Sequence, residues 1–197
     1  MTYGGYTYKL SPNWYDRIIH PHPPMSAICY ILVGVPGCGK STLAAKIAAS
    51  NPIYQIVSTD QIRAELYGDA SIQGTWQEVE TQVLQQIHQH LSAGYPVIYD
   101  ATNCQRAWRL DLLAKLAKYK NIDWIALYVQ IPLEQCQLRN QQRQRQVPES
   151  VIINMAQCLE LYPPTTSEGF AAVYAIATTD FDKINGVQSL APHTMND

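Results

Sequence analysis

The chain has 197 residues, of which 47% are hydrophobic and 15% charged, with a formal net charge of −2. This length suits one domain with a complete core, and the charge excludes a broad basic surface for nucleic acid, so any such contact must be local. Five scattered cysteines without a C-x-x-C pair favour a reducing, cytoplasmic location, and no apolar run reaches the ~18 residues of a membrane span.

Residues 1–26 are rich in proline, glycine and aromatic side chains, and they are expected to form an arm outside the main domain. Pro21, Pro23 and Pro24 prevent long regular structure. The many aromatic side chains indicate that the arm packs on the domain or on a partner subunit. We expect the domain itself to span residues 27–180 and a C-terminal tail to span residues 181–197.

The apolar run at residues 27–33 predicts a buried strand, and a glycine-rich stretch follows it directly. That stretch fits G-x-x-x-x-G-K-[ST], the phosphate-binding P-loop. Its backbone N–H groups can cradle phosphate oxygens, Lys40 can reach the β- and γ-phosphates, and the Ser41 hydroxyl can bind Mg²⁺. Residues 41–49 are rich in helix formers, so strand, loop and helix follow in the required order. The positions expected to bind the nucleotide are Gly34, Val35, Pro36, Gly37, Cys38, Gly39, Lys40, Ser41 and Thr42.

A second strand is predicted over residues 54–58, just before Asp60. Open α/β sheets place their ligands at the carboxyl ends of strands. Asp60 is therefore a candidate general base for an acceptor hydroxyl, and Arg63, almost one helical turn later, is a candidate to grip the acceptor. The alternative is that Asp60 only caps a helix and that Arg63 is a solvated charge. This segment leaves both interpretations open.

Apolar residues at helical spacing next predict one amphipathic helix, with the stripe Trp76, Val79, Val83, Leu84, Ile87 and Leu91. A third strand, residues 96–100, ends in Asp100. An acid at this position commonly holds Mg²⁺ in P-loop proteins, although it can also cap the helix predicted over residues 106–118. Arg106 and Arg109 lie at the start of that helix, where the positive end of the helix dipole repels their charge. This placement indicates either a nearby anion or solvated side chains.

The fourth predicted strand covers residues 123–129, and a glutamine-rich helix follows from Pro132. Arg139 and Arg143 are four residues apart, so they are expected to share one helix face and to bind a common anion. The alternative is a solvated polar helix. A further helix is predicted from residue 149, and residues 170–176 are predicted to form the last strand.

Several separate segments resemble the P-loop kinases of the polynucleotide 5′-hydroxyl-kinase group and, more loosely, the zeta-toxin-like kinases. The resemblance covers residues 27–176. The matching segments are Gly34–Thr42, Ser58–Arg63, Tyr99–Asn103, Arg139–Arg143 with Val147–Glu149, and Glu168–Phe170.

On the donor side, the resemblance implies that Lys40 stabilises the transferred phosphoryl group and that Ser41 holds Mg²⁺. Asp100 orients the site beside the metal, and Arg143 is a lid arginine that stabilises the transition state. These roles suit phosphoryl transfer, which depends mostly on positioning and charge stabilisation.

On the acceptor side, the resemblance implies that Asp60 is the general base for a 5′-hydroxyl. Arg63 contacts the phosphate of the acceptor, and Arg139 supports the lid. Thr102 and Arg139 are further candidates to bind the acceptor. The low positive charge favours a short acceptor over a long polynucleotide, because fewer cationic contacts are then needed.

The expected fold is a three-layer α/β P-loop kinase fold. It has a five-stranded parallel sheet in the order 2-3-1-4-5, an order taken from the resemblance, with helices on both faces and a small helical lid. The expected activity is transfer of the γ-phosphate of ATP, with Mg²⁺, to a hydroxyl acceptor. A 5′-OH oligonucleotide is the first candidate acceptor, and a metabolite or nucleotide sugar is the second. A third possibility is an ATP-binding module that transfers no phosphate and acts through its N-terminal arm.

Overall fold

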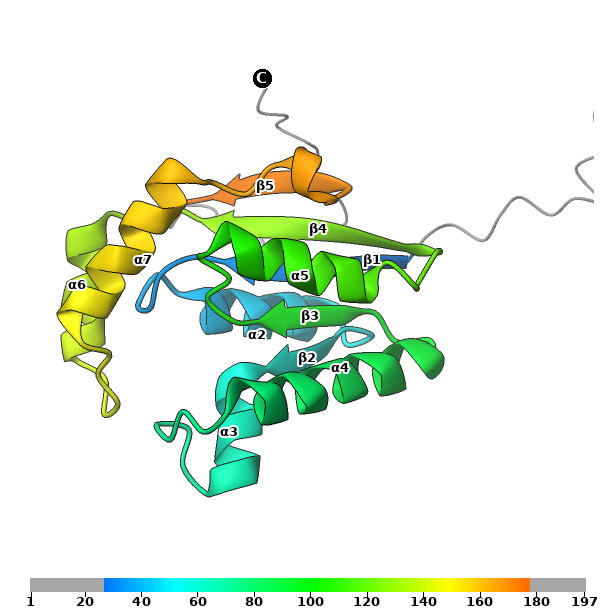
Figure 1. Ribbon diagram of the computed structural model, residues 1–197, viewed down its shortest axis with the longest axis horizontal. Coiled ribbons are helices and arrows are strands. Elements are labelled where there is room, and N and C mark those ends of the chain that lie inside the picture. Colours follow the sequence, from blue (N-terminus) through cyan, green and yellow to red (C-terminus); the bar gives the residue numbers. More distant parts are fainter. Residues whose placement is uncertain (1–26, 178–197) are drawn as a thin grey trace, which may run out of the picture.

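A parallel five-stranded sheet in the order β2-β3-β1-β4-β5 forms the centre of the molecule, seen in a computed structural model that describes residues 27–177 (Figure 1). The strands are β1 (Ala27–Val33), β2 (Gln55–Ser58), β3 (Val97–Asp100), β4 (Ile122–Val129) and β5 (Ala172–Ile176). The expected fold class and strand order are confirmed. The expected arm and the whole of the expected tail lie outside the described residues.

The central strand β1 shows why the sheet forms from these segments. It pairs with β3 on one side and with β4 on the other, where the register runs from Ala27 opposite Ile122 to Val33 opposite Tyr128. Ile31, Leu32 and Val33 are fully buried. A strand covered on both faces needs a continuous apolar sequence, as residues 27–33 have.

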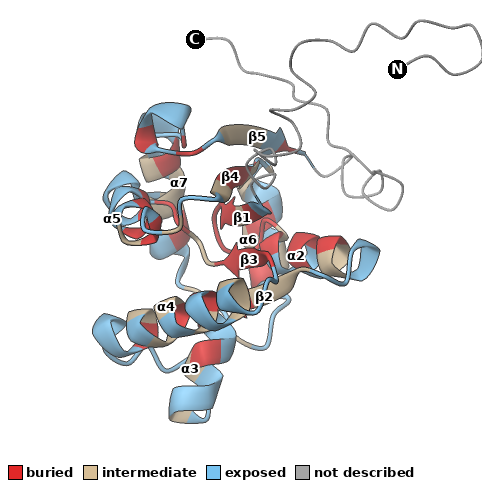
Figure 2. Cartoon of the chain, turned by 90° about the vertical axis from the view of Figure 1, so that its right-hand side faces the viewer, coloured by how far each residue is buried: buried red, intermediate tan, exposed pale blue. Residues whose placement is uncertain are grey.

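Helices cover both faces of the sheet and the ends of its strands. Their bounds are α2 (Lys40–Ser50), α3 (Thr59–Tyr67), α4 (Trp76–Ser92), α5 (Arg106–Leu116), α6 (Leu133–Gln141), α7 (Glu149–Leu161) and the 3₁₀ helix η1 (Thr166–Glu168). Helix α2 lies on one face, and α4 and α5 lie on the other (Figure 2). Helices α6 and α7 lie beyond the carboxyl ends of the strands, in the place expected for a lid (Figure 1).

The apolar stripe of α4 is confirmed except at its first residue. Val79, Val83 and Ile87 are buried, whereas Trp76 is 51% exposed. Trp76 is the first residue of the helix and lies before the turns that contact the core. Its assignment to the buried stripe is therefore wrong.

The helix that carries Arg139 ends earlier than the glutamine-rich sequence predicts. Helix α6 stops at Gln141, so Arg143 lies in the connection of residues 142–148, which we call the lid loop. The Asn140 side chain causes this, because its amide donates to the Val147 carbonyl at 2.9 Å and accepts from the Val147 N–H at 3.0 Å. The prediction that Arg139 and Arg143 share a helix face is wrong.

Across residues 27–177, no helix combines the length and the apolar character needed to cross a membrane.

Candidate active site

The P-loop connects the end of β1 to the start of α2 at the carboxyl edge of the sheet. Gly39 is the N-cap of α2 and has a left-handed backbone, with φ 100° and ψ 17°. Gly37 also has a positive φ of 84°, and a Cβ there would collide with the Cys136 carbonyl of α6. Both positions therefore require glycine, one for its backbone conformation and one also for close packing. The loop and the following helix N-terminus provide an anion-binding concavity.

Lys40 is held against the loop that precedes it. Its Nζ donates to the Val35 carbonyl at 2.9 Å and lies 3.6 Å from the Cys38 sulfur. The residue is only 8% exposed, and Cys38 is fully buried. The ammonium thus lies along the phosphate-binding loop, in position to bind phosphate oxygens.

Asp100 brings several of the predicted residues into one electrostatic environment. Burial raises the pKa of its carboxyl group, while the hydrogen bond from the Ser41 hydroxyl and the charge of Lys40 oppose the rise. Asp60 raises this pKa further, and Arg143 lowers it. The donor residues and the proposed base therefore lie close enough to influence one another. The N-cap of α5 is Gln105, so the alternative that Asp100 caps this helix is wrong.

A hydrogen bond between Ser41 and Asp100 places two side-chain oxygens side by side at the P-loop. Within residues 27–177, no group of three or more His, Cys, Asp or Glu side chains is arranged to hold a metal. Mg²⁺ in phosphate-transfer sites usually takes one or two protein oxygens and completes its shell with phosphate oxygens and water. This donor set therefore fits Mg²⁺ bound together with a nucleotide.

Asp60 lies in the first turn of α3, and both of its close polar partners are arginines. The N-cap of α3 is Ser58, whose hydroxyl accepts from the Gln61 N–H at 3.5 Å, so the alternative that Asp60 caps the helix is wrong. The Asp60 Oδ1 lies 3.3 Å from Arg63 Nη1 and 2.9 Å from Arg145 Nη1, while the Asp60 side chain is 61% exposed.

Arg63 is largely buried, which contradicts the alternative that it is a solvated charge. Its side chain is 13% exposed. Its Nε is buried and has no hydrogen-bond partner among the described residues. A buried guanidinium N–H without a partner is unfavourable, so the position of this side chain is not explained by its contacts with the described residues alone.

The lid arginines occupy different surroundings. Arg143 lies in the lid loop, and its charge acts on Asp100. Arg139 lies in the last turn of α6, and its charge opposes the burial that raises the pKa of Cys136 to about 11. The structure therefore relates Arg143 to the donor residues, whereas an acceptor role for Arg139 stays a prediction.

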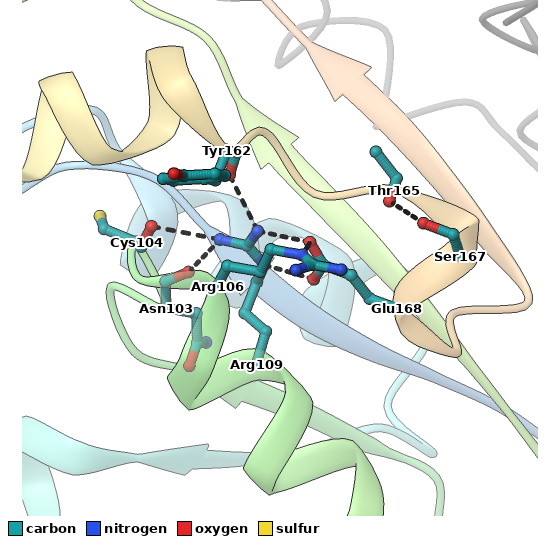
Figure 3. Close-up of polar contacts among 8 residues, drawn as sticks. All are labelled: Asn103, Cys104, Arg106, Arg109, Tyr162, Thr165, Ser167 and Glu168. Carbon is teal, nitrogen blue, oxygen red and sulfur yellow. Dashed lines mark hydrogen bonds and ion pairs between the residues drawn. The ribbon is translucent and has the colours of Figure 1, made fainter.

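A buried ion pair between Arg109 and Glu168 fixes the loop that follows Asp100 (Figure 3). Arg109 donates to the Glu168 carboxylate from Nε at 2.7 Å and from Nη2 at 2.6 Å. The same guanidinium donates to the carbonyls of Asn103, Cys104 and Tyr162 at 2.9–3.2 Å. Glu168 is thus the anion that the arginine at the helix N-terminus indicated, although the sequence did not identify it. Arg106 lies at 3.7 Å from the same carboxylate.

The fixed loop is also joined to the P-loop. The Gly34 N–H donates to the Thr102 carbonyl at 2.9 Å. Asn103 has a positive φ of 48°, and its side-chain amide donates to the Leu32 carbonyl at 2.7 Å. Thr102 therefore lies beside the phosphate-binding loop, and a role for its side chain in acceptor binding stays a prediction.

Comparisons with known proteins show the family to which the chain belongs. Residues 30–162 match the AAA_33 family model, described as an AAA domain. The chain belongs to the AAA_33 family. An L-seryl-tRNA(Sec) kinase from Methanococcus maripaludis is 31% identical over an alignment of 134 residues, which covers 64% of this AAA_33 chain and 49% of that protein. The chain thus spans about half the length of this curated relative.

Two solved structures are similar to the AAA_33 chain in fold. A chain of the Pnkp1/Rnl/Hen1 RNA repair complex has a TM-score of 0.65 at 24% identity. The matched region covers 76% of the AAA_33 chain and 48% of the chain in that complex. A gluconokinase from Sinorhizobium meliloti 1021 has a TM-score of 0.51 at 19% identity, with coverages of 83% and 89%. Together with the family match, these comparisons confirm the expected grouping with the P-loop kinases, a nucleotide-binding class.

Proposed function

We propose that this AAA_33 protein transfers the γ-phosphate of ATP, in the presence of Mg²⁺, to a hydroxyl acceptor, and that the acceptor is the 5′-OH end of a short nucleic acid. The observation that carries the proposal is the placement of Asp60. Its carboxylate lies at the carboxyl edge of the sheet, and its side chain is largely exposed to solvent. It is also close enough to Asp100 to raise the pKa of that buried acid.

The donor side is built from the P-loop and its neighbours. The loop amides and Lys40 would bind the β- and γ-phosphates, and Ser41 and Asp100 would hold the metal. Mg²⁺, when bound, would neutralise charge on the phosphate oxygens. A hollow of about 330 Å³ adjoins Val35 and is lined in part by Pro132, Leu133, Ala156 and Leu159. Both polar and apolar groups line this hollow, and it offers space for the nucleotide base.

The acceptor side is built around Asp60. Its carboxylate would take the proton of the acceptor hydroxyl while the new oxygen–phosphorus bond forms and the bond between the γ-phosphorus and the bridging oxygen breaks, leaving ADP. Arg143 would stabilise the charge on the transferred group. Arg63, with its buried donor, would bind an anionic part of the acceptor.

A nucleic-acid end is preferred as the acceptor because of the residues around Asp60. Arginine guanidinium groups suit phosphate oxygens, and two of them, those of Arg63 and Arg145, lie beside the Asp60 carboxylate. The names of an RNA repair complex and a seryl-tRNA kinase among the similar proteins agree with this preference. The gluconokinase similarity keeps a small-molecule acceptor as the second candidate.

The test replaces the proposed base. Asp60→Asn is expected to reduce transfer from labelled ATP by about 10²–10⁴-fold, as loss of a general base does, while the Kd for ATP changes less than about twofold. Asp111→Asn is the matched control, because Asp111 is another exposed aspartate in an ion pair, with Lys115 at 2.6 Å. Transfer that survives in Asp60→Asn would show that Asp60 is not the base.

The acceptor is identified by incubating the wild-type protein with a panel of 5′-OH oligonucleotides, nucleosides and sugars. Labelling of the oligonucleotides is the expected result. Labelling of sugars alone would replace the first acceptor candidate with the second. ATP binding without transfer to any member of the panel would indicate a binding module instead of a kinase.

A further inference from the structure

Arg145 forms a contact that neither the sequence patterns nor the family resemblance assigned. It lies in the lid loop, yet its Nη1 is 2.9 Å from Oδ1 of Asp60 on α3. Its side chain is 30% exposed, so it is partly covered in this position. The contact joins the lid to the residue that we propose as the general base.

Two guanidinium groups therefore meet at one carboxylate oxygen. Arg63 approaches Asp60 Oδ1 from within α3 at 3.3 Å, and Arg145 approaches the same atom from the lid loop. Neither ion pair uses Oδ2, so one oxygen can still accept a proton while the other is paired. Around this carboxylate, cationic donors come from two separate elements.

The two lid-loop arginines act on different acids. Arg143 contributes to the field at Asp100, beside the P-loop. Arg145, two residues further along, contacts Asp60. The pKa of Asp69 is lowered mainly by hydrogen bonds with Ser71, and the charge of Arg145 lowers it further. The lid loop thus has one arginine near the donor residues and another near the acceptor residues.

We propose that Arg145 is an acceptor-binding residue, which pairs with Asp60 when no acceptor is present and binds a phosphate adjacent to the acceptor hydroxyl when one arrives. Arg63 and Arg145 would then hold that phosphate from two sides while Asp60 holds the hydroxyl. This inference rests on the proposed function of Asp60. It limits the acceptor to hydroxyl compounds that carry a nearby phosphate, such as a nucleoside 3′-monophosphate or a longer 5′-OH nucleic acid.

The experiment compares the binding of a nucleoside 3′-monophosphate with that of the same nucleoside without phosphate. Calorimetric titrations use the full chain with Mg²⁺ and a non-hydrolysable ATP analogue. Arg145→Gln is expected to weaken binding of the monophosphate by about tenfold or more, the loss expected for one charge-assisted hydrogen bond. Binding of the nucleoside should change less than about twofold, because it lacks the anion. Arg145→Lys should retain part of the affinity, since it keeps the charge and loses the fork geometry.

Lys120→Gln is the matched control, because it removes one exposed cation near the amino end of β4, at the opposite edge of the sheet. It should leave both affinities unchanged, and all variants should bind the ATP analogue like the wild type. Equal losses of affinity for the nucleoside and the monophosphate would mean that Arg145 only stabilises the position of the lid loop and does not bind the phosphate. Unchanged monophosphate binding in Arg145→Gln would refute the inference directly.

The outcomes separate this inference from the proposed function. If the wild-type protein binds no monophosphate but phosphorylates an uncharged sugar, the role of Arg145 is wrong and the kinase proposal stands. If the monophosphate binds in an Arg145-dependent way but no phosphate is transferred, the kinase proposal fails and the phosphate-binding role remains.

Discussion

Two acids at the carboxyl edge of the sheet have different environments, and the difference favours the separate roles that we propose for them. Asp60 is 61% exposed on its side chain, where an acceptor can reach it. Asp100 is 7% exposed, and burial raises its pKa. An ionised carboxylate in such a position is unfavourable until a cation approaches it. Asp100 is therefore suited to bind a metal ion, and Asp60 is suited to exchange an arginine partner for an acceptor hydroxyl.

The burial of Asp100 gives a prediction about stability. Because its pKa is raised in the folded state, its ionised form is destabilising above that pKa, and the destabilisation disappears as pH falls and the group binds a proton. Asp100→Asn should therefore raise Tm at pH 7.5, and the gain should shrink as the pH falls through the raised pKa toward the ordinary value of an aspartate. Thermal unfolding without nucleotide measures both values.

The same substitution should weaken Mg²⁺-dependent nucleotide binding, since it removes a proposed metal ligand. Glu134→Gln is the control, because Glu134 is an exposed acid in the first turn of α6 and should give no such pH-dependent gain. A lower Tm for Asp100→Asn at pH 7.5 would mean that its bond with Ser41 outweighs the effect of burial.

Between elements, the ion pair of Arg109 and Glu168 joins segments that share no strand pairing. It connects α5 to η1, and through backbone carbonyls it reaches the loop after β3 and the end of α7. The pair is completely buried, with both side chains 0% exposed. Its removal should therefore affect the site through the position of the loop that carries Thr102.

Arg109→Met is expected to reduce the free energy of unfolding by about 3–5 kcal/mol, because it leaves the Glu168 carboxylate buried without its partner. The double variant Arg109→Met with Glu168→Met should be less destabilised than Arg109→Met alone, since it removes the uncompensated charge as well. Urea unfolding measures each value. A loss of less than about 1 kcal/mol in the single variant would show that water replaces the guanidinium and that the ion pair of Arg109 and Glu168 is not essential for stability.

The elements also show which features the sequence could predict. Buried parallel strands require continuous apolar runs, so residues 27–33 gave β1 at its observed bounds. The end of α6 could not be predicted in this way, because glutamine and arginine allow a helix to continue past residue 141. The Asn140 side chain ends it through contacts with Val147 that local propensity does not describe.

The site was predictable to the extent that the sheet topology determined it. Asp60 and Asp100 each follow a strand, and parallel strands bring such positions to one edge. The partners of these acids were not predictable. Arg145 and Asp60 are 85 positions apart, and Arg109 and Glu168 are 59 apart, so no periodic pattern connects them. Only the unfavourable place of Arg109 at a helix N-terminus indicated that an anion was near.

On the scale of the whole molecule, the parallel direction of the strands places the site residues at one edge of the sheet. The net charge of −2 gives the protein no general electrostatic attraction for nucleic acid. If Arg63 and Arg145 are the main acceptor contacts, affinity should depend on one local phosphate. A long strand would then gain little over a short one, because its further phosphates would add no cationic contact.

Salt dependence measures this directly. For single-stranded nucleic acid, the slope of log K against log salt is about −0.7 for each phosphate contact, so one or two contacts predict a slope between about −0.7 and −1.4. Fluorescence anisotropy with 5′-OH oligonucleotides of increasing length, labelled at the 3′ end, should give this slope at every length. Arg145→Gln should make it shallower by about 0.7, the share of one contact, and Lys120→Gln should leave it unchanged. A slope steeper than about −3, or affinity that grows steadily with length, would require a row of further phosphate contacts and would contradict recognition confined to the acceptor end.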